Sequence, residues 1–376
     1  MGHASYPNIL ERAGAEDADM VIAATHSDEV NMVSCQVALS IFEVPRKIAR
    51  LRSQSYLDAI YADIYRRDHL PIDVVISPEL EVAEAALRRL SAPAAFDSEL
   101  LFGGQAQLIG ITIGTACPVQ DTPLRQLTDL FSTLRARVVG IRREGRLFAP
   151  EPNDQLFAGD ACYVMAPIED VPRTLEVIGK AARKQERLVI LGGGNVGLRV
   201  ARSLEARSER IRAKIIEKSR ACAERAADAL EKTIVLHGDG LDSHLMSEAG
   251  IERADAILTV TDDDKTNLLA AVRAKQAGAR MAIRLVNDPT LVPLLDALDI
   301  DAYINPRGTT VSSILRHIRH GRVKNVYSIG DAEAEVIEAQ VLSTSPISGQ
   351  KIQDIDFPEG VLVGSILSGG EVIAPT

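Results

Sequence analysis

The chain has 376 residues, of which 46% are hydrophobic and 25% charged, and its formal net charge is −10. This length predicts two to four compact units, and the acidic balance argues against nucleic acid as a partner. No run of about 18 apolar residues is present, so the sequence predicts no membrane-spanning helix. The four cysteines form no CxxC pair, which favours small buried residues over a metal site or a disulfide framework.

An internal repeat is the first organising feature along the chain. Residues 18–33 read ADMVIAATHSDEVNMV and residues 254–269 read ADAILTVTDDDKTNLL, with Thr25 and Thr261 matched at a separation of 236 positions. The repeat predicts two copies of one α/β unit.

The register of this repeat slips further along the chain. IARL at 48–51 aligns with AIRL at 282–285, which places Arg50 over Arg284. We therefore expect these two arginines to hold equivalent positions at the end of a strand.

A second, smaller repeated unit follows each copy. Residues 138–150, VVGIRREGRLFAP, resemble residues 363–375, VGSILSGGEVIAP, and both predict a β-hairpin with a glycine turn. The fold class predicted is therefore α/β, in which doubly wound, parallel Rossmann-type domains alternate with small α+β domains as a tandem duplication. The predicted domains are 1–92, 93–180, 185–308 and 322–376.

The repeat also predicts which parts are missing. The second copy carries a glycine motif that starts 46 positions before Gly238, and its counterpart in the first copy would lie before Met1. We expect the first Rossmann-type unit to lack its glycine loop and the second small unit to be incomplete, as in a chain truncated at both ends.

Residues 187–217 carry the most specific motif, RLVILGGGNVGLRVARSLEARSERIRAKIIE. An apolar run leads into Gly192-x-Gly194-x-x-Gly197, a helical segment follows, and a second apolar run ends at Glu217. This order is typical of dinucleotide binding, because the glycines allow a tight turn, close approach of a pyrophosphate and close helix packing. The carboxylate would bind ribose hydroxyls and repel a 2′-phosphate, which favours NAD(H) or an adenosine nucleotide over NADP(H).

Six strands alternating with helices are predicted in the second Rossmann-type unit. The strand ends place Asp239, Thr261 and Arg284 at the edge where open α/β sheets bind ligands. Two alternatives remain: Thr261 caps the next helix, and Arg284 pairs with one of the aspartates that follow Thr261. The predicted strands are 187–191, 213–217, 233–237, 256–260, 281–286 and 302–304, and the predicted helices are 195–207, 219–231, 242–249, 265–277, 289–298 and 309–319.

The motifs GGGNVG with Glu217, HGDG, ADAILTVTDDDKTNLLAA and AIRLVND resemble the domains that regulate conductance in potassium channels and transporters. The doubled order of units resembles the regulatory proteins of Trk-type potassium uptake. This resemblance implies a cytoplasmic protein, peripheral on the inner face of the plasma membrane, that forms a homo-oligomeric ring beneath a Trk-type potassium-translocating membrane subunit. It also implies binding of NAD(H), or of ATP or ADP, as a conformational signal.

The resemblance assigns nucleotide-binding residues by position. The second unit supplies most of them, and the first unit retains four. They are Gly192, Gly194, Asn195, Val196, Gly197, Glu217, Asp239, Thr261 and Arg284, together with Gly2, His3, Thr25 and Arg50.

Two other functions compete with the regulatory hypothesis. An NAD-dependent oxidoreductase would use His237 or His244 as proton carrier, but no separate substrate domain offers an acid–base set, so we predict that the chain is not an enzyme. A purely structural module with a vestigial site is the third hypothesis.

Overall fold

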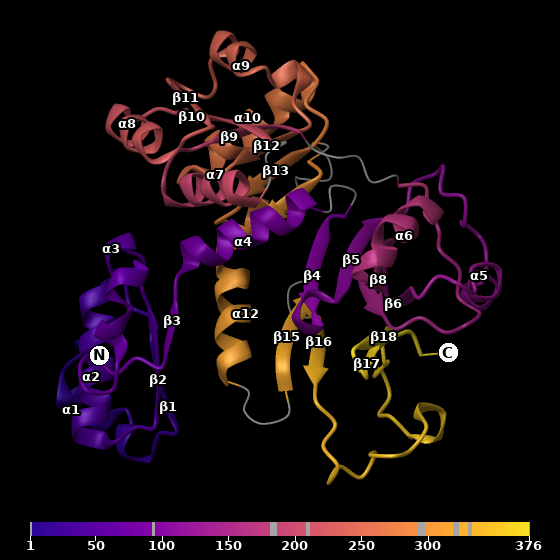
Figure 1. The fold of residues 1–376 in the computed structure, drawn as a ribbon, viewed down its shortest axis with the longest axis horizontal. Helices are drawn as coiled ribbons and strands as arrows, with labels where there is room; N and C mark the ends of the chain where they lie inside the picture. The colour runs from indigo at the N-terminus through magenta and orange to yellow at the C-terminus, as the bar shows by residue number, and fades with distance from the viewer. Residues whose placement is uncertain are drawn as a thin grey trace.

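The computed structural model describes residues 2–91, 95–180, 186–207, 211–291, 298, 300–318, 323–329 and 333–375. Figure 1 shows a six-stranded α/β unit at the top, a smaller α/β unit beside the N-terminus and an antiparallel sheet between them and the C-terminus. Within the described residues, no helix is both long enough and apolar enough to cross a bilayer.

The second Rossmann-type unit is a six-stranded parallel sheet with strand order β11-β10-β9-β12-β13-β14. The order reverses between β9 and β12, which makes the doubly wound fold predicted from the sequence. Its strands are β9 (Arg187–Leu191), β10 (Arg212–Glu217), β11 (Ile234–His237), β12 (Ala256–Thr259), β13 (Ala282–Leu285) and β14 (Ala302–Ile304).

Helices cover both faces of this sheet. They are α7 (Asn195–Arg207), α8 (Arg220–Ala229), α9 (Ser243–Ala249) and α10 (Asp264–Ala277), with 3-10 turns η5 (Ile251–Arg253) and η6 (Pro289–Leu291). The last helix of the unit, α12 (Pro306–Ile318), lies off this sheet and packs instead against the helix that follows β3 (Val74–Ile76) of the first unit (Figure 1). Of the helix predicted over 289–298, the structure has η6, and residues 292–297 lie outside the described part of the chain.

Local signals fix where α10 begins and ends. The Asp263 carboxylate accepts hydrogen bonds from the backbone N–H groups of Lys265 and Thr266, and Gly278 ends the helix in the left-handed conformation. The cap places α10 directly behind the end of β12.

The first Rossmann-type unit has a three-stranded parallel sheet in the order β1-β2-β3. Its elements are α1 (Pro7–Arg12), η1 (Ala15–Asp17), β1 (Met20–Ala23), α2 (Asp28–Phe42), β2 (Arg46–Arg50), α3 (Gln54–Leu57), η2 (Ala59–Tyr65) and β3 (Val74–Ile76).

The same pair of side-chain hydrogen bonds holds the turn between strand and helix in both units. Asn31 accepts hydrogen bonds from the Thr25 N–H and hydroxyl at 2.8 and 2.7 Å, and Asn267 accepts the same two from Thr261 at 2.9 and 2.8 Å. The matched threonines and asparagines of the repeat are therefore structural partners of each other.

Hydrogen bonds correct the alignment of the two arginines. The Asp28 carboxylate accepts from the N–H groups of Arg52 and Ser53, whereas the equivalent Asp264 accepts from those of Asn287 and Asp288. Arg52 is therefore equivalent to Asn287, a separation of 235 positions where the sequence alignment used 234.

Strand register leads to the same correction. Ala23 pairs with Ala49, and its repeat partner Thr259 pairs with Arg284. Arg284 is thus equivalent to Ala49, and Arg50 to Leu285, so the expected equivalence of Arg50 and Arg284 is wrong. The shared dipeptide Arg-Leu sets the sequence alignment, whereas the alternation of side chains along the strand decides which side of the sheet each residue faces.

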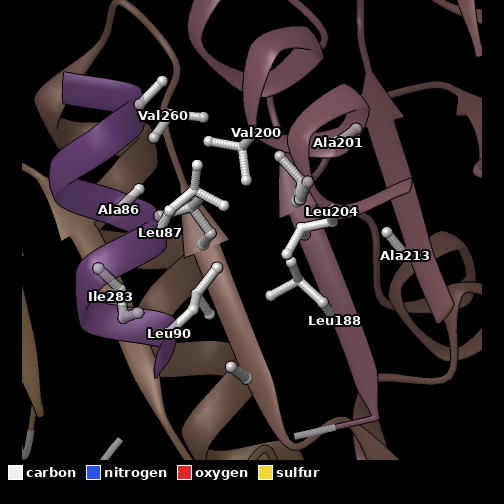
Figure 2. Packing of buried hydrophobic residues seen from close by; sticks show 14 of the residues in the cluster. Ala86, Leu87, Leu90, Leu188, Val200, Ala201, Leu204, Ala213, Val260 and Ile283 are labelled. Carbon is white, nitrogen blue, oxygen red and sulfur yellow. The ribbon is translucent and has the colours of Figure 1, made fainter. Parts of the chain in front are cut away.

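The helix after β3, α4 (Pro78–Ser91), packs on the second Rossmann-type unit. Figure 2 shows Ala86, Leu87 and Leu90 of α4 facing the side of the sheet that also carries Val200 and Leu204 of α7. Fully burying a leucine side chain contributes about 1.5–3 kcal/mol, so this apolar face fastens the two units together.

Antiparallel strands form the small units. The first has a five-stranded sheet in the order β4-β5-β8-β6-β7, and the second has the hairpins β15-β16 and β17-β18. The elements are β4 (Asp97–Leu101), η3 (Phe102–Gly104), β5 (Ala106–Thr112), α5 (Leu124–Leu130), β6 (Arg137–Arg143), β7 (Arg146–Phe148), β8 (Ala161–Pro167), η4 (Ile168–Asp170), α6 (Val171–Val177), β15 (Val323–Ile329), β16 (Ala334–Ala339), η7 (Ile352–Asp354), β17 (Ile366–Ser368) and β18 (Glu371–Ile373).

Both predicted hairpins are present. β6 and β7 are joined by Glu144-Gly145, and β17 and β18 by Gly369-Gly370, with all four residues at positive φ. The fold class predicted from the sequence is confirmed: parallel Rossmann-type sheets together with small antiparallel α+β units.

A buried carboxylate anchors the sheet of the first small unit. Asp160 is 2% exposed and accepts hydrogen bonds from Arg143 Nε and Nη2 at 2.9 and 2.7 Å and from the Phe157 N–H at 2.8 Å. Burial alone would raise the pKa of Asp160, but these donors outweigh it and lower the pKa below its ordinary value.

We expect Asp160→Asn to lower the free energy of unfolding by about 1.5–3 kcal/mol at pH 7, because hydrogen bonds to the ionised carboxylate are lost. A lowered folded-state pKa gives stability that is present above the unfolded-state pKa and is lost as pH falls through the folded-state value. Urea unfolding at a series of pH values should show the difference between wild type and variant shrinking below about pH 4. The exposed Asp129→Asn change is the control, and an equal effect there would contradict the prediction.

Candidate functional site

The glycine loop between β9 and α7 has the tight turn and the close helix packing predicted for Gly192 and Gly197. Gly192 has φ +110°, and a Cβ there would lie 3.0 Å from the Val260 carbonyl oxygen. A Cβ on Gly197 would lie 1.9 Å from the Gly192 carbonyl oxygen, whereas one on Gly194 meets nothing within 4 Å. Gly197 therefore lets α7 start close against the loop, and Gly194 faces open space.

Glu217 at the end of β10 is held beside this loop. Its Oε2 accepts a hydrogen bond from the Gly193 N–H at 2.6 Å, and its Oε1 accepts one from the Ser219 N–H at 2.7 Å. The carboxylate is thus fixed at the position from which it could accept hydrogen bonds from two neighbouring ribose hydroxyls.

A cavity of about 1200 Å³ opens over this edge of the sheet. The second unit contributes the glycine loop and the ends of β10, β11, β12 and β13, and the first unit contributes the segment after β2 and the start of α4. Eight predicted residues line it together: Gly192, Gly194, Asn195, Val196, Glu217, Asp239, Thr261 and Arg50.

The structure places the remaining predicted residues elsewhere. Gly197 is buried beneath the loop, and Arg284 is completely buried in β13. Gly2, His3 and Thr25 do not line the cavity: a Cβ on Gly2 would meet Ile9, the His3 ring contacts Ser5 and Tyr6, and Thr25 is bonded to Asn31.

Both histidines considered for an oxidoreductase lie on the surface outside the cavity. His237 is exposed and contacts the Lys218 carbonyl oxygen at 3.2 Å, and the exposed His244 is in α9. Neither histidine lines the cavity, where a proton carrier would have to reach a bound substrate.

Several lining residues had no sequence signal. Arg52, Glu79 and Val82 come from the first unit, and Lys218, Cys222 and Asn287 from the second. Glu79 and Val82 reach the cavity because α4 packs on the other unit, a contact that no local motif encodes, and Arg52 pairs with Glu79 there. Lys218 adjoins Glu217 and Asn287 lies within the AIRLVND motif, so for these two residues proximity to a motif is the available clue.

Charges of both signs face the cavity. Arg52 pairs with Glu79 at 2.9 Å, and Lys218 pairs with Asp239 at 3.0 Å. The Leu241 N–H and the Lys218 ammonium lower the pKa of Asp239, so this carboxylate stays ionised. Among the described residues, no group of three histidine, cysteine or acidic side chains is placed to hold a metal ion.

The comparisons with known proteins agree with this architecture. The TrkA-N domain model matches residues 1–78 and 188–306, and the TrkA-C domain model matches residues 108–179. The chain is 46% identical over 376 residues to the Trk system potassium uptake protein TrkA of Azorhizobium caulinodans, covering 100% of this chain and 82% of that protein.

The chain belongs to the TrkA family of Trk-system potassium-uptake proteins. A second member of the family, from Halomonas elongata, is 35% identical over 375 residues, covering 99% of this chain and 81% of that one. TrkA proteins are regulatory components and not catalysts, so the chain is not an enzyme.

Solved structures share the fold at low sequence identity. The GsuK RCK domain aligns with a TM-score of 0.58 at 18% identity, covering 84% of this chain and 65% of that one. The GsuK channel bound to NAD aligns with a TM-score of 0.57 at 18% identity, covering 84% of this chain and 54% of that one.

We expect Gly197→Ala to destabilise the nucleotide-free protein by about 1–3 kcal/mol, because the new methyl group overlaps the Gly192 carbonyl oxygen. Thermal unfolding without ligand measures this effect. Gly194→Ala is the matched control, since its methyl group enters open space and should leave the melting temperature unchanged. Equal effects of the two changes would show that α7 does not approach the loop as described.

Proposed function

We propose that this TrkA-family chain is a nucleotide-sensing regulatory subunit that binds NAD(H), or ATP or ADP, and gates a Trk-type potassium-translocating membrane subunit. The observation that carries the proposal is the convergence of the glycine loop, the fixed Glu217 carboxylate and residues of the first unit on one cavity. We propose as nucleotide contacts Gly192, Gly194, Asn195, Val196, Glu217, Asp239, Thr261 and Arg50.

The placement of the cavity supports regulation rather than simple binding. Arg50 and the start of α4 belong to the first unit, whereas the glycine loop belongs to the second. A nucleotide in the cavity would contact both units, so its binding would favour one relative arrangement of them. A shift from mostly closed to mostly open needs about 5.5 kcal/mol of differential affinity, a figure within reach of several sites acting together.

Assembly and location are part of the same proposal. Val33 on α2 and Leu269 on α10 hold equivalent positions in the repeat, and both are exposed apolar residues, at 45% and 52%. Equivalent apolar positions on two helices suit a homo-oligomeric ring, which we propose lies at the cytoplasmic face of the membrane. The domain division at 1–92, 93–180, 185–308 and 322–376 belongs to this proposal.

Glu217→Ala should weaken NADH binding about tenfold or more, because hydrogen bonds from ribose hydroxyls to an ionised carboxylate are lost. Equilibrium titration of the purified chain, followed by NADH fluorescence, measures the change. The exposed Glu224→Ala variant on α8 removes an equal charge outside the cavity and should bind NADH as wild type does. Absence of saturable binding to the wild type would refute the proposed nucleotide site.

Arg50→Ala should weaken ATP binding about tenfold and NADH binding less, since a guanidinium from the first unit pairs best with the more highly charged phosphate chain. Competition of ATP against bound NADH gives both affinities. Arg12→Ala, an exposed change on α1, is the control. Unchanged ATP affinity in Arg50→Ala would mean that the first unit takes no part in binding.

A further inference from the structure

Arg284 points away from the cavity, toward helix α10. Along β13, Ile283 and Leu285 pack in the core that contains α4 and α7. Ala282 and Val286, two positions to either side of Arg284, pack in the opposite core with α9 and α10. Because side chains alternate across a strand, Arg284 lies on the α10 side of the sheet.

The guanidinium of Arg284 is buried without a hydrogen-bond partner. The residue is 0% exposed, and its Nε, Nη1 and Nη2 have no hydrogen-bond partner among the described residues. Burial lowers the pKa of Arg284, and the charge of Asp264 opposes this shift without outweighing it. The equivalent position in the first unit is Ala49, so the fold itself does not require an arginine there. A buried guanidinium without hydrogen bonds is strongly unfavourable, which indicates that a second state of the protein supplies them.

Asp264 is placed to be that partner. It lies in the first turn of α10, on the same side as Asn267 and Ala271, which are buried against the sheet. Its carboxylate now accepts hydrogen bonds from the backbone N–H groups of Asn287 and Asp288 at 2.9 and 2.7 Å and from Asn287 Nδ2 at 3.0 Å. Asp264 and Asn287 both line the cavity, so the carboxylate lies between the cavity and the side of the sheet that carries Arg284.

We propose that Arg284 is a positioning residue for the nucleotide cavity: when a nucleotide binds, the Asp264 carboxylate leaves the turn at Asn287–Asp288 and pairs with Arg284, and the freed N–H groups turn toward the ligand. The physical cause is repulsion, because nucleotide phosphates bring negative charge beside Asp264, and Arg284 offers the carboxylate a buried countercharge. The inference rests on the proposed function and replaces direct contact of Arg284 with phosphate.

The test compares wild type with Arg284→Met and Arg284→Lys, by thermal unfolding without nucleotide and by titration with NADH and with ATP. Arg284→Met should raise the nucleotide-free melting temperature by roughly 2–4 °C, because an unpaired charge is replaced by an apolar side chain. The same variant should bind both nucleotides about tenfold more weakly. Arg284→Lys, which keeps a charge for Asp264, should restore most of the affinity. A purely structural role would not move stability and affinity in opposite directions.

Matched carboxylate variants complete the experiment. Asp264→Asn should weaken nucleotide binding, and adding Arg284→Met to it should cause little further loss, since both changes remove one interaction. Asp28→Asn removes the matching carboxylate charge in the first unit, where Ala49 replaces the arginine, so combining it with Arg284→Met should give additive effects. Unchanged affinity in Arg284→Met, or a lower nucleotide-free melting temperature, overturns the inference about Arg284 but leaves the proposed function untouched. Failure of the wild type to bind either nucleotide overturns the proposed function as well.

Discussion

Burial of the apolar face of α4 against the second Rossmann-type unit is the interaction on which the rest of the structure depends. Ala86, Leu87 and Leu90 belong to the first unit in the sequence, but their side chains pack in the core around α7 of the second unit. Among the described residues, the sheet of the first unit has three strands, and α12 of the second unit packs against its strand β3 in return. The two Rossmann-type units are therefore joined by a shared core and not by a loose linker.

This shared core also builds the cavity. The start of α4 is carried to the edge of the second sheet, where Glu79 pairs with Arg52 across from the glycine loop. At its other end, Arg89 of α4 pairs with the buried Asp97 of β4 at 2.7 Å, and Tyr327 of β15 donates a hydrogen bond to the same carboxylate at 2.5 Å. Helix α4 thus connects the cavity with strands of both small units. It is a rigid element through which a structural change at the cavity could reach those units.

The two copies of the repeat place an aspartate at the same position but neutralise it with different lysines. Asp73 accepts from the Lys47 N–H at 2.6 Å and Asp301 from the Ala282 N–H at 2.7 Å, at equivalent positions. The first carboxylate is neutralised by Lys47 on the strand and the second by Lys275 on the helix, each at 2.9 Å. Each copy therefore neutralises this carboxylate with a lysine, although the lysine comes from a different element. Arg284, by contrast, has no charged counterpart in the first unit, where Ala49 holds its position.

The sequence by itself determined the local structure: the strands of the second unit and most of its helices, both glycine hairpins, and the strand–glycine loop–helix–acid motif ending at Glu217. These follow from hydrophobic periodicity and from backbone conformations that only glycine adopts easily, and both are properties of neighbouring residues. The tertiary structure decided which arginine faces the cavity, because a shift of one residue in strand register moves a side chain to the other side of the sheet. It also decided that Arg50, Arg52 and Glu79 meet the glycine loop, since that contact depends on where α4 is buried and not on any residue near it in the chain.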